Sequence, residues 1–340
     1  AVDGGGHRGV AHLALGRALA HAQGQMLALR AGSVRAHLWR PRGEARAGDG
    51  AELQRCADAC QAHGTVDIAA FGGAFVLLLS DERDGAFMLA NDRLGICPVY
   101  YLAGKDRLCF ASDADALAGS HDFHREFDPQ AIYDYVFFHC IPSPRTIYRG
   151  MRKLEPASVL RGKGANVDVQ TYWMPRFASF DRAPGEQAAA LVECLTAAVG
   201  ARIQPASGAF LSGGLDSSTV AGLLAGHEAG ARTFTIGFDA DGYDESGYAR
   251  IAARHFGTVH HEYFVTPKDV CESLPGIASS YGEPFGNSSV IPTFHCARFA
   301  REHGIETMLA GDGGDELFAG NTRYLDQNVF ERYFKVPVVL

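Results

Sequence analysis

A loop rich in glycine and serine follows a short apolar segment in the second half of the chain, with the sequence FLSGGLDSS at 210–218. Two glycines let a backbone approach an anion closely, and a helix that starts there adds its positive end. Ser212 and Ser217 add hydroxyl donors, so phosphate is the expected anion. The loop lacks the Gly-Lys-Ser/Thr of the Walker motif, but Asp216 offers a carboxylate that can hold Mg²⁺ against a pyrophosphate. The alternative, an ordinary strand-to-helix turn with serine caps, explains fewer of these residues.

A second motif, LAGDGGDELFAG at 309–320, places three carboxylates within five residues: Asp312, Asp315 and Glu316. Like charges this close repel one another, and a bound metal would relieve the repulsion. Acidic residues also favour the first turn of a helix for reasons unrelated to function. The presence of the first motif favours the functional interpretation.

Strands and helices alternate around both motifs. We expect helices at 186–203, from 218, at 245–256, 268–281 and 292–303, and strands at 209–211, 233–238, 258–265 and 306–310. This alternation is typical of a parallel sheet with helices on both faces. Ligands of such sheets bind beyond the carboxyl ends of the strands, where the strand order reverses. Both motifs follow expected strands, so we expect them to meet there.

The first half has a different pattern of apolar segments. Short apolar segments at 74–79, 86–90, 99–102 and 108–111 are separated by turn residues and predict an antiparallel meander. They are continuously apolar, so both faces of the sheet should be covered. Helices are expected at 11–23, at 51–63 and after Asp128, followed by a wandering connection to residue 172. A linker is expected at 174–187.

Composition limits the class of protein. The chain has 340 residues, enough for two domains of ~100–200 residues each. Apolar residues make up 47%, and the formal charge is −8, which argues against a nucleic-acid partner. We find no apolar run that could span a membrane and no secretory signal. The eight cysteines are scattered, so we expect free thiols and a cytoplasmic protein.

The second half resembles a known family at several points. The motif at 210–218, TIGF at 235–238, GTVHHE at 257–262, EPFGNSS at 283–289 and GDGGDELFAG at 311–320 are similar in order and spacing to the synthetase domain of the asparagine synthetase family. The resemblance implies an α/β domain at 186–340 with a doubly wound parallel sheet, of the ATP-pyrophosphatase (adenine nucleotide alpha hydrolase-like) fold.

The first half resembles the class-II glutamine amidotransferase domain of the same family. The similar segments are FGGAF at 71–75, NDRLGICPVYY at 91–101 and FASD at 110–113. The resemblance implies an α+β domain at 1–175, an Ntn-hydrolase-like sandwich of antiparallel sheets. It is good from about residue 66 to 172 and poor before that.

The resemblance also implies roles for individual residues. Asp216 and Asp315 match the carboxylates that hold Mg²⁺ and pyrophosphate. Asp312 stands where the family commonly has glutamate, and its shorter carboxylate would be a catalytic residue near the amine nucleophile. The adenine of ATP would lie against the strand around Ile236. The residues implied to bind ATP or pyrophosphate are Leu211, Ser212, Gly213, Gly214, Asp216, Ser217, Ser218, Ile236, Gly237 and Gly311.

The implied reaction is adenylation of a carboxylate with release of pyrophosphate, followed by attack of a nitrogen nucleophile to give an amide. Implied ligands are small: Mg²⁺, ATP, a carboxylate such as L-aspartate, and ammonia from glutamine or free ammonium. Neither nucleic acid nor membrane is an expected partner, and a homodimer is left open. The alternatives are a lactam- or peptide-cyclising ligase with a non-functional glutaminase domain and a non-catalytic ATP-binding scaffold.

The chain departs from the family at both ends. A working amidotransferase of this class begins with a catalytic Cys, whereas this chain starts with Ala1 and its first cysteine is Cys56. The Arg-His-Arg-Gly-Pro and Asn-Gly-Glu-Ile-Tyr-Asn segments are absent, and the run 48–52 only faintly resembles the loop that holds the glutamine amino group. We therefore expect a degenerate glutaminase half rather than simple loss of an N-terminal portion. We also expect a truncated C-terminus, because Lys335 comes too early to be the family's catalytic lysine.

Other polar residues have simpler interpretations. Asp92 and Arg93 are expected to form a structural turn. His260 and His261 are adjacent in a predicted strand and therefore point to opposite faces, so a shared metal is not expected.

Overall fold

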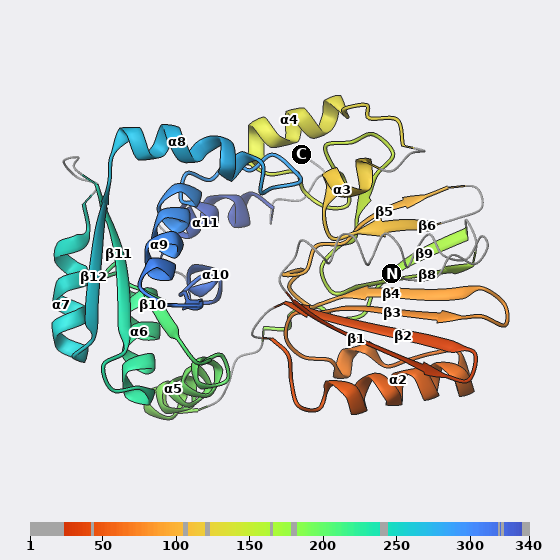
Figure 1. Cartoon of the computed structure of the whole chain (residues 1–340), viewed down its shortest axis with the longest axis horizontal. Coiled ribbons are helices and arrows are strands. Elements are labelled where there is room, and N and C mark those ends of the chain that lie inside the picture. The colour runs from red at the N-terminus through yellow and green to blue at the C-terminus, as the bar shows by residue number, and fades with distance from the viewer. Residues whose placement is uncertain are drawn as a thin grey trace. The chain divides into compact units, whose positions relative to one another are not determined.

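The computed structural model describes residues 24–41, 44–104, 108–119, 123–163, 166–177, 182–238, 244–318, 320 and 323–334. The expected helix at 11–23 lies outside these residues. The chain divides into two compact units. The first unit comprises Ala1–Phe180 and Pro275–Ser288, and the second comprises Asp181–Leu274 and Ser289–Leu340. Figure 1 labels the elements of each unit.

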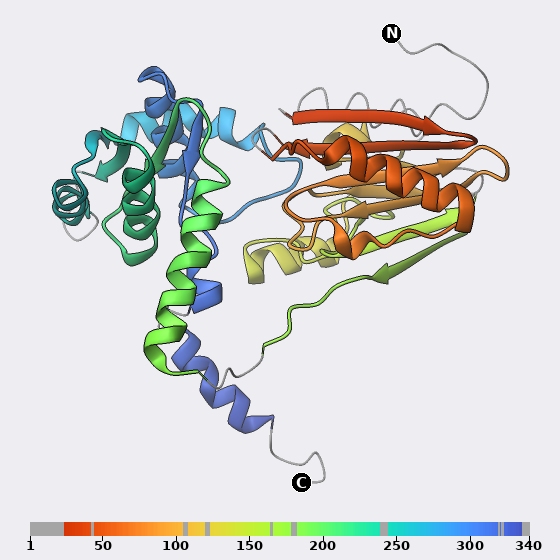
Figure 2. The ribbon, with the colours of Figure 1, turned by 90° about the horizontal axis from the view of Figure 1, so that it is seen from below.

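The first unit is built on an antiparallel sheet with the strand order β1-β2-β3-β4-β8-β9. Its strands are β1 (Gly24–Ala31), β2 (Val34–Pro41), β3 (Val76–Asp81), β4 (Ala86–Asn91), β8 (Ser158–Lys163) and β9 (Asn166–Thr171). Helix α2 (Asp49–His63) covers one face, where its Leu53 packs in one cluster with Leu77 and Leu79 of β3 (Figures 1 and 2). A 3₁₀ turn, η1 (Ile68–Ala70), precedes β3.

A smaller sheet covers the other face of this sheet. It has the order β6-β5-β7, with β5 (Tyr100–Ala103), β6 (Leu108–Ala111) and β7 (Arg152–Lys153). Leu78 and Leu89 of the large sheet pack with Tyr101 and Phe110 of the small one. Because neighbouring residues such as Leu77 and Leu78 serve opposite faces, the strands are apolar throughout.

Two helices cover the outer face of the small sheet: α3 (Ala114–Ala118) and α4 (Pro129–Phe138). Each begins at an aspartate whose carboxylate accepts a backbone N–H, Asp113 from Ala116 and Asp128 from Gln130. The first unit is therefore layered helix, sheet, sheet, helix (Figure 1).

The second unit contains a parallel sheet with the order β12-β11-β10-β13. Its elements are α5 (Pro184–Gly200), β10 (Ser207–Phe210), α6 (Leu215–His227), β11 (Arg232–Phe238), α7 (Ser246–Phe256), β12 (Val259–Val265), α8 (Pro267–Ala278), α9 (Val290–Glu302), β13 (Thr307–Leu309), α10 (Gly314–Phe318) and α11 (Arg323–Tyr333).

Helices lie on both faces of this parallel sheet. Ala209 and Leu309 pack with α5, α6 and α7, whereas Phe234 and Met308 pack with Cys296 and other residues of α9. Met308 and Leu309, which are adjacent on β13, thus face opposite sides of the sheet, as expected for a strand that is buried on both sides.

Several expectations from the sequence are confirmed. The strands that were predicted in each half and the helix after Asp128 lie within a few residues of their expected positions, and the sheets have the expected antiparallel and parallel character. All eight cysteines are free.

Within the described residues, no helix has both the length and the apolarity that crossing a bilayer requires.

Two expectations for the first half were wrong. The apolar strands do not form one meander, because β4 pairs with β8 and β5 belongs to a second sheet. The connection to residue 172 does not wander, since it contains β7, β8 and β9. Strands β1 and β2 were also missed, and in β2 the arginines Arg35 and Arg40 hide the apolar alternation that identifies strands.

Candidate functional site

The two chemical motifs meet at one edge of the parallel sheet. Strand β10 pairs with β11 on one side and with β13 on the other. The chain runs outward from β10 to β12 and returns on the opposite side as β13, so the strand order reverses at β10. The loop 211–214 follows the carboxyl end of β10, and the loop 310–313 follows that of β13. This is where a doubly wound sheet binds its ligands.

The loop after β10 is held in shape by its own serines. The hydroxyls of Ser212 and Ser217 lie 2.9 Å apart, and the N–H of Ser212 donates to Ser217 Oγ over 3.2 Å. The N–H of Gly214 donates to Ser212 Oγ over 3.3 Å. The hydroxyl of Thr235 on β11 donates to the carbonyl of Leu211 and fixes the start of the loop. Helix α6 begins directly after Gly214, so its first N–H groups border the loop.

Gly213 requires the conformational freedom of glycine. Its φ is +86°, and an added Cβ would lie 2.6 Å from the backbone nitrogen of Ala249 on α7. A side chain there would therefore be strained and would also push the loop away from α7. The sequence pattern identified the two glycines, but only the packing shows that α7 supports this turn.

The carboxylate of Asp216 lies against the second motif. An added Cβ at Gly311 would be 2.8 Å from Asp216 Cβ, and one at Gly314 would collide with the carboxylate itself. These glycines thus make room for Asp216 between β10 and β13. The sequence did not predict this role for Gly314, although the density of glycines in the motif was a signal for a close approach of this kind.

The other two acids of the site are placed differently. Asp315, on the short helix α10, is half-buried and lies beside the backbone of Gly320. Asp312 is exposed in the turn before α10. Among the described residues, no group of three or more His, Cys, Asp or Glu side chains could by itself hold a metal ion. Mg²⁺ in nucleotide sites takes one or two carboxylates and completes its shell with phosphates and water, so Asp216 and Asp315 fit that kind of ion.

The strand expected to support adenine is β11. Ile236 is half-buried in the cluster that β11 forms with α9. Gly237 is buried, and an added Cβ would lie 2.5 Å from the ring of Phe264 on β12. The ring of Phe264 therefore covers the backbone of Gly237, and Phe264 is itself 45% exposed.

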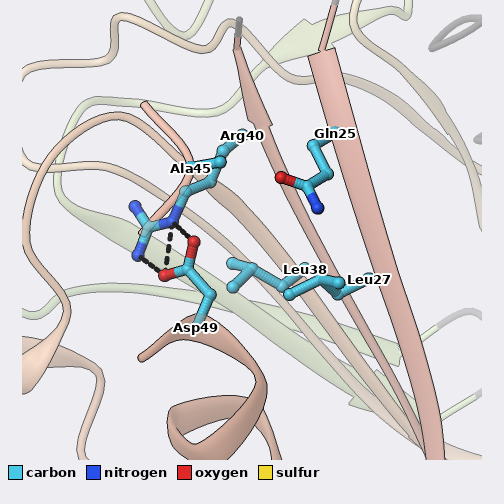
Figure 3. A pocket seen from close by; sticks show the side chains of 6 residues that line it. All are labelled: Gln25, Leu27, Leu38, Arg40, Ala45 and Asp49. Atoms are coloured by element: carbon cyan, nitrogen blue, oxygen red, sulfur yellow. Dashed lines mark hydrogen bonds and ion pairs between the residues drawn. The ribbon is translucent and has the colours of Figure 1, made fainter. Parts of the chain in front are cut away.

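In the first unit, residues 49–52 of the run 48–52 form the first turn of α2, and Asp49 is already paired. Asp49 and Arg40 on β2 form an ion pair of 2.7 Å with side-chain exposures of 3% and 1% (Figure 3). Asp49 also accepts the N–H of Arg46, and Arg40 donates to the carbonyls of Gly72 and Ala74. The pocket around the pair is lined by Gln25, Leu27, Leu38, Arg40, Ala45 and Asp49. The Asp49 carboxylate is therefore committed to internal partners.

Other polar residues singled out from the sequence have structural contacts. The Asp92 carboxylate accepts the N–H groups of Leu94, Ile96 and Cys97, which is a structural turn. His260 contacts the hydroxyl of Thr233 through Nδ1, and His261 stacks on Phe234. The pKa of each histidine is lowered, mainly by burial.

Comparison with known proteins agrees with this architecture. The sequence model of the family described as "Asparagine synthase" matches residues 190–338, and that of "Glutamine amidotransferase domain" matches residues 53–173. A glutamine phosphoribosylpyrophosphate amidotransferase structure from B. subtilis aligns with 74% of this chain and 52% of its own at 14% identity, with a TM-score of 0.23, which is too low to bear on the fold.

Three curated relatives carry asparagine synthetase names. A "Putative asparagine synthetase [glutamine-hydrolyzing]" of Mycobacterium bovis is 32% identical over 77% of this chain and 41% of its own. A second putative enzyme, of Methanocaldococcus jannaschii, is 31% identical over 79% and 54%, and "Asparagine synthetase [glutamine-hydrolyzing] 1" of Bacillus subtilis is 28% identical over 78% and 42%. The chain spans about half the length of these relatives or less. On these matches, and on the order of its two kinds of domain, the chain belongs to the asparagine synthetase family.

Proposed function

We propose that this protein is an ATP-dependent amide ligase of the asparagine synthetase type. Its second unit would be an ATP-pyrophosphatase domain, and its first unit would be an amidotransferase-like domain of the Ntn-hydrolase type. The observation that supports this most directly is the position of Asp216, which lies beside Gly311 and Gly314 at the reversal of strand order. A phosphate-type loop and an acidic loop would thereby form a single ligand site.

In the proposed reaction, an oxygen of the substrate carboxylate attacks the α-phosphorus of ATP. The bond from that phosphorus to the bridging oxygen breaks and pyrophosphate leaves. An amine then attacks the activated carbonyl carbon, AMP leaves and the amine nitrogen loses a proton. L-Aspartate is the proposed carboxylate, and asparagine would be the product.

The chain's own groups have separate tasks in this scheme. The backbone N–H groups and hydroxyls of the loop from Ser212 to Ser218 would hold the phosphates. Asp216 and Asp315 would hold Mg²⁺, which when bound neutralises charge on the pyrophosphate. Asp312 is exposed and unconstrained by described partners, and its carboxylate would accept the proton of the attacking amine.

The nitrogen source is proposed to be free ammonium rather than glutamine. Residues 49–52 form the first turn of α2, and both oxygens of Asp49 face Arg40, whose Nη2 also lies 3.9 Å from Glu52 Oε2. A glutamine amino group would have to displace a buried, bidentate arginine, which is strongly unfavourable. The first unit would then be a scaffold rather than a glutaminase.

The test is pyrophosphate release from Mg·ATP by the protein, with aspartate and ammonium compared against aspartate and glutamine. We expect release with ammonium only. Release with both nitrogen sources would refute the loss of glutaminase activity. If neither mixture supports release while ATP still binds, aspartate is the wrong carboxylate and a cyclising or other amide-forming ligase becomes the better reading.

The variant Asp216→Asn tests the proposed role of this carboxylate, because it keeps the shape of the side chain and removes its charge. We expect pyrophosphate release to fall by about 10²-fold or more, because a charge aimed at the leaving group is lost from a preorganised site. Asp326→Asn, in the exposed helix α11, is the control and should leave release unchanged. Equal activity of Asp216→Asn and the unmodified protein would refute the proposed site.

A further inference from the structure

Helix α7 supports the loop 211–214 from behind, within the second unit. An added Cβ at Gly213 would lie 2.6 Å from the backbone nitrogen of Ala249 and 2.6 Å from the carbonyl carbon of Tyr248. Ala249 is fully buried in one cluster with Leu211, the first residue of the loop. The loop thus rests on helix backbone rather than on the flexible end of a side chain. A shift of α7 would therefore move the loop as well.

The two ends of α7 are held in different ways. The end far from the loop is Phe256, from which only Gly257 and Thr258 lead to β12. At the end beside the loop, the Asp244 carboxylate accepts the N–H of Ser246 over 3.2 Å and its hydroxyl over 2.9 Å. This contact closes the first turn but does not join the helix to the sheet.

A bidentate ion pair makes that connection. Arg250 of α7 donates from Nε to Glu262 Oε1 and from Nη2 to Glu262 Oε2, each over 2.7 Å. Glu262 lies on β12, and the pairing with Arg250 holds the pKa of its carboxyl below the usual range. Two parallel hydrogen bonds fix the direction of a contact as well as its length. The pair therefore sets where α7 lies along β12.

The spacing along the chain agrees with this role. Arg250 precedes Phe256 by six residues, which is about 9 Å along a helix. Glu262 follows Val259 by three residues, which is about 10 Å along a strand. The helix and the strand run side by side in opposite directions, so the pair meets without strain. Arg250 also directly follows Ala249, and the pair thus acts at the turn of α7 that touches the loop.

Glu262 is itself fixed within the sheet. It lies opposite Thr235 of β11, whose hydroxyl donates to the carbonyl of Leu211 at the start of the loop. His260 Nε2 lies 3.3 Å from Glu262 Oε1, and its Nδ1 contacts the Thr233 hydroxyl over 3.0 Å. The carboxylate and the start of the loop are therefore both tied to β11.

We propose that Glu262 is a positioning residue, which through Arg250 holds α7 behind the loop 211–214 and thereby fixes the shape of that loop. Every contact that carries this inference lies within the second unit. The inference rests on the proposed function for its kinetic consequence but not for its effect on the loop.

The test compares Glu262→Gln, Arg250→Met and the double variant with a matched control. Lys268→Met is the control, because it also removes a positive charge from an ion pair of the second unit, the one between Lys268 and Glu272 on α8. Arg250 is 48% exposed and Glu262 20%, so their pair contributes little to global stability and all variants should fold. The double variant should lose no more than Arg250→Met alone, because both changes remove the same contact. Losses that add up would overturn the proposal.

The first readout is amide hydrogen exchange of residues 211–218 and 246–253, which needs no enzymatic activity. The first segment includes the N–H groups of Ser212 and Gly214, which hydrogen bonds within the loop protect. We expect about tenfold faster exchange in both segments for each single variant and no change for Lys268→Met. Unchanged exchange, or faster exchange in 246–253 alone, would overturn the proposal.

The second readout is the kinetics of pyrophosphate release. We expect the KM for Mg·ATP to rise about tenfold in both single variants, because the groups that hold the phosphates are displaced. A loss of folded protein would lower kcat without changing KM, so an unchanged KM would contradict the positioning role.

The two single variants also separate positioning from a direct effect of charge. Glu262→Gln makes the protein more positive and Arg250→Met makes it more negative, so a direct effect on ATP would change KM in opposite directions. That result would likewise overturn the proposal. If the unmodified protein releases no pyrophosphate, the proposed function fails, and the exchange of the two segments still decides the role of Glu262.

Discussion

At the scale of single residues, the geometry of the site depends on its glycines as much as on its charged side chains. Asp216 of the first motif lies against the second motif, where Gly311 and Gly314 leave the space for it. Because the glycine at 314 begins α10 with an ordinary φ, it is not required by backbone conformation. Its role is to allow close approach, which makes it a sensitive position for testing the geometry.

Gly314→Ala adds only a methyl group, but that group would collide with the Asp216 carboxylate. We expect kcat/KM for pyrophosphate release to fall by about 10²-fold, because displacement of a catalytic group by about 1 Å has effects of that size. Gly226→Ala is the control, since a Cβ there meets nothing within 4 Å and the residue lies in helix α6. Alanine there should stabilise the helix by about 0.5–1 kcal/mol and leave the rate unchanged. Full activity of Gly314→Ala would contradict the close approach.

At the scale of elements, the buried ion pair between Arg40 and Asp49 joins β2 to the start of α2. Arg40 is 1% exposed and reaches two further carbonyls, so it is the central polar contact of this region. A buried pair of this kind contributes little beyond a well-packed apolar pair, but losing one partner leaves a buried charge without compensation.

Arg40→Met should therefore lower the free energy of unfolding of the first unit by about 3–5 kcal/mol. Arg35→Gln on the same strand removes a pair with Glu82 in which the arginine is 46% exposed, and should cost less than about 1 kcal/mol. Denaturant unfolding followed by tryptophan fluorescence measures both, because Trp39 is next to Arg40. A double variant, Arg40→Met with Asp49→Leu, should recover part of the loss. Similar costs for Arg40→Met and Arg35→Gln would refute the structural role.

At the scale of the whole molecule, we expect the two units to differ in their response to acid. His260, His261 and His295 all lie in the second unit, and burial lowers the pKa of each below its usual 6.5. The unfolded chain therefore binds these protons more readily than the folded one. The stabilisation is present above about pH 6.5 and is lost as the pH falls toward and through the lower folded pKa values.

We expect the second unit to melt at a lower temperature at pH 5.5 than at pH 7.5. Trp39 and Trp173 are the two tryptophans of the chain, and both lie in the first unit, so fluorescence follows that unit while far-UV circular dichroism follows both. The dichroism transition should shift more than the fluorescence transition. His261→Phe keeps an aromatic ring for stacking on Phe234 and should reduce the difference. Equal shifts in both signals would show that these histidines do not dominate.

Much of the second unit could be predicted from local sequence, because its strands are short apolar runs and its loops carry unusual residues. The phosphate-type loop and the acidic loop follow β10 and β13 as expected, and parallel alternation implies that such strand ends lie at one edge. The antiparallel strands β3 to β6 were predictable for the same reason. Strands β1 and β2 were not, because the arginine that β2 buries has the polarity of a surface residue until its partner Asp49 is placed.

What the sequence by itself determined is the set of local elements, the chemistry carried by the loops after β10 and β13, and the division into an antiparallel and a parallel half. Only the tertiary structure decided that β4 pairs with β8 rather than β5, that Gly314 makes room for Asp216, and that Glu283 pairs with Lys153 in the first unit. The physical reason is that backbone preferences and apolar periodicity act over a few residues. The pairing of remote strands, a buried ion pair 130 positions apart and the space around a glycine depend on the packing of the folded chain.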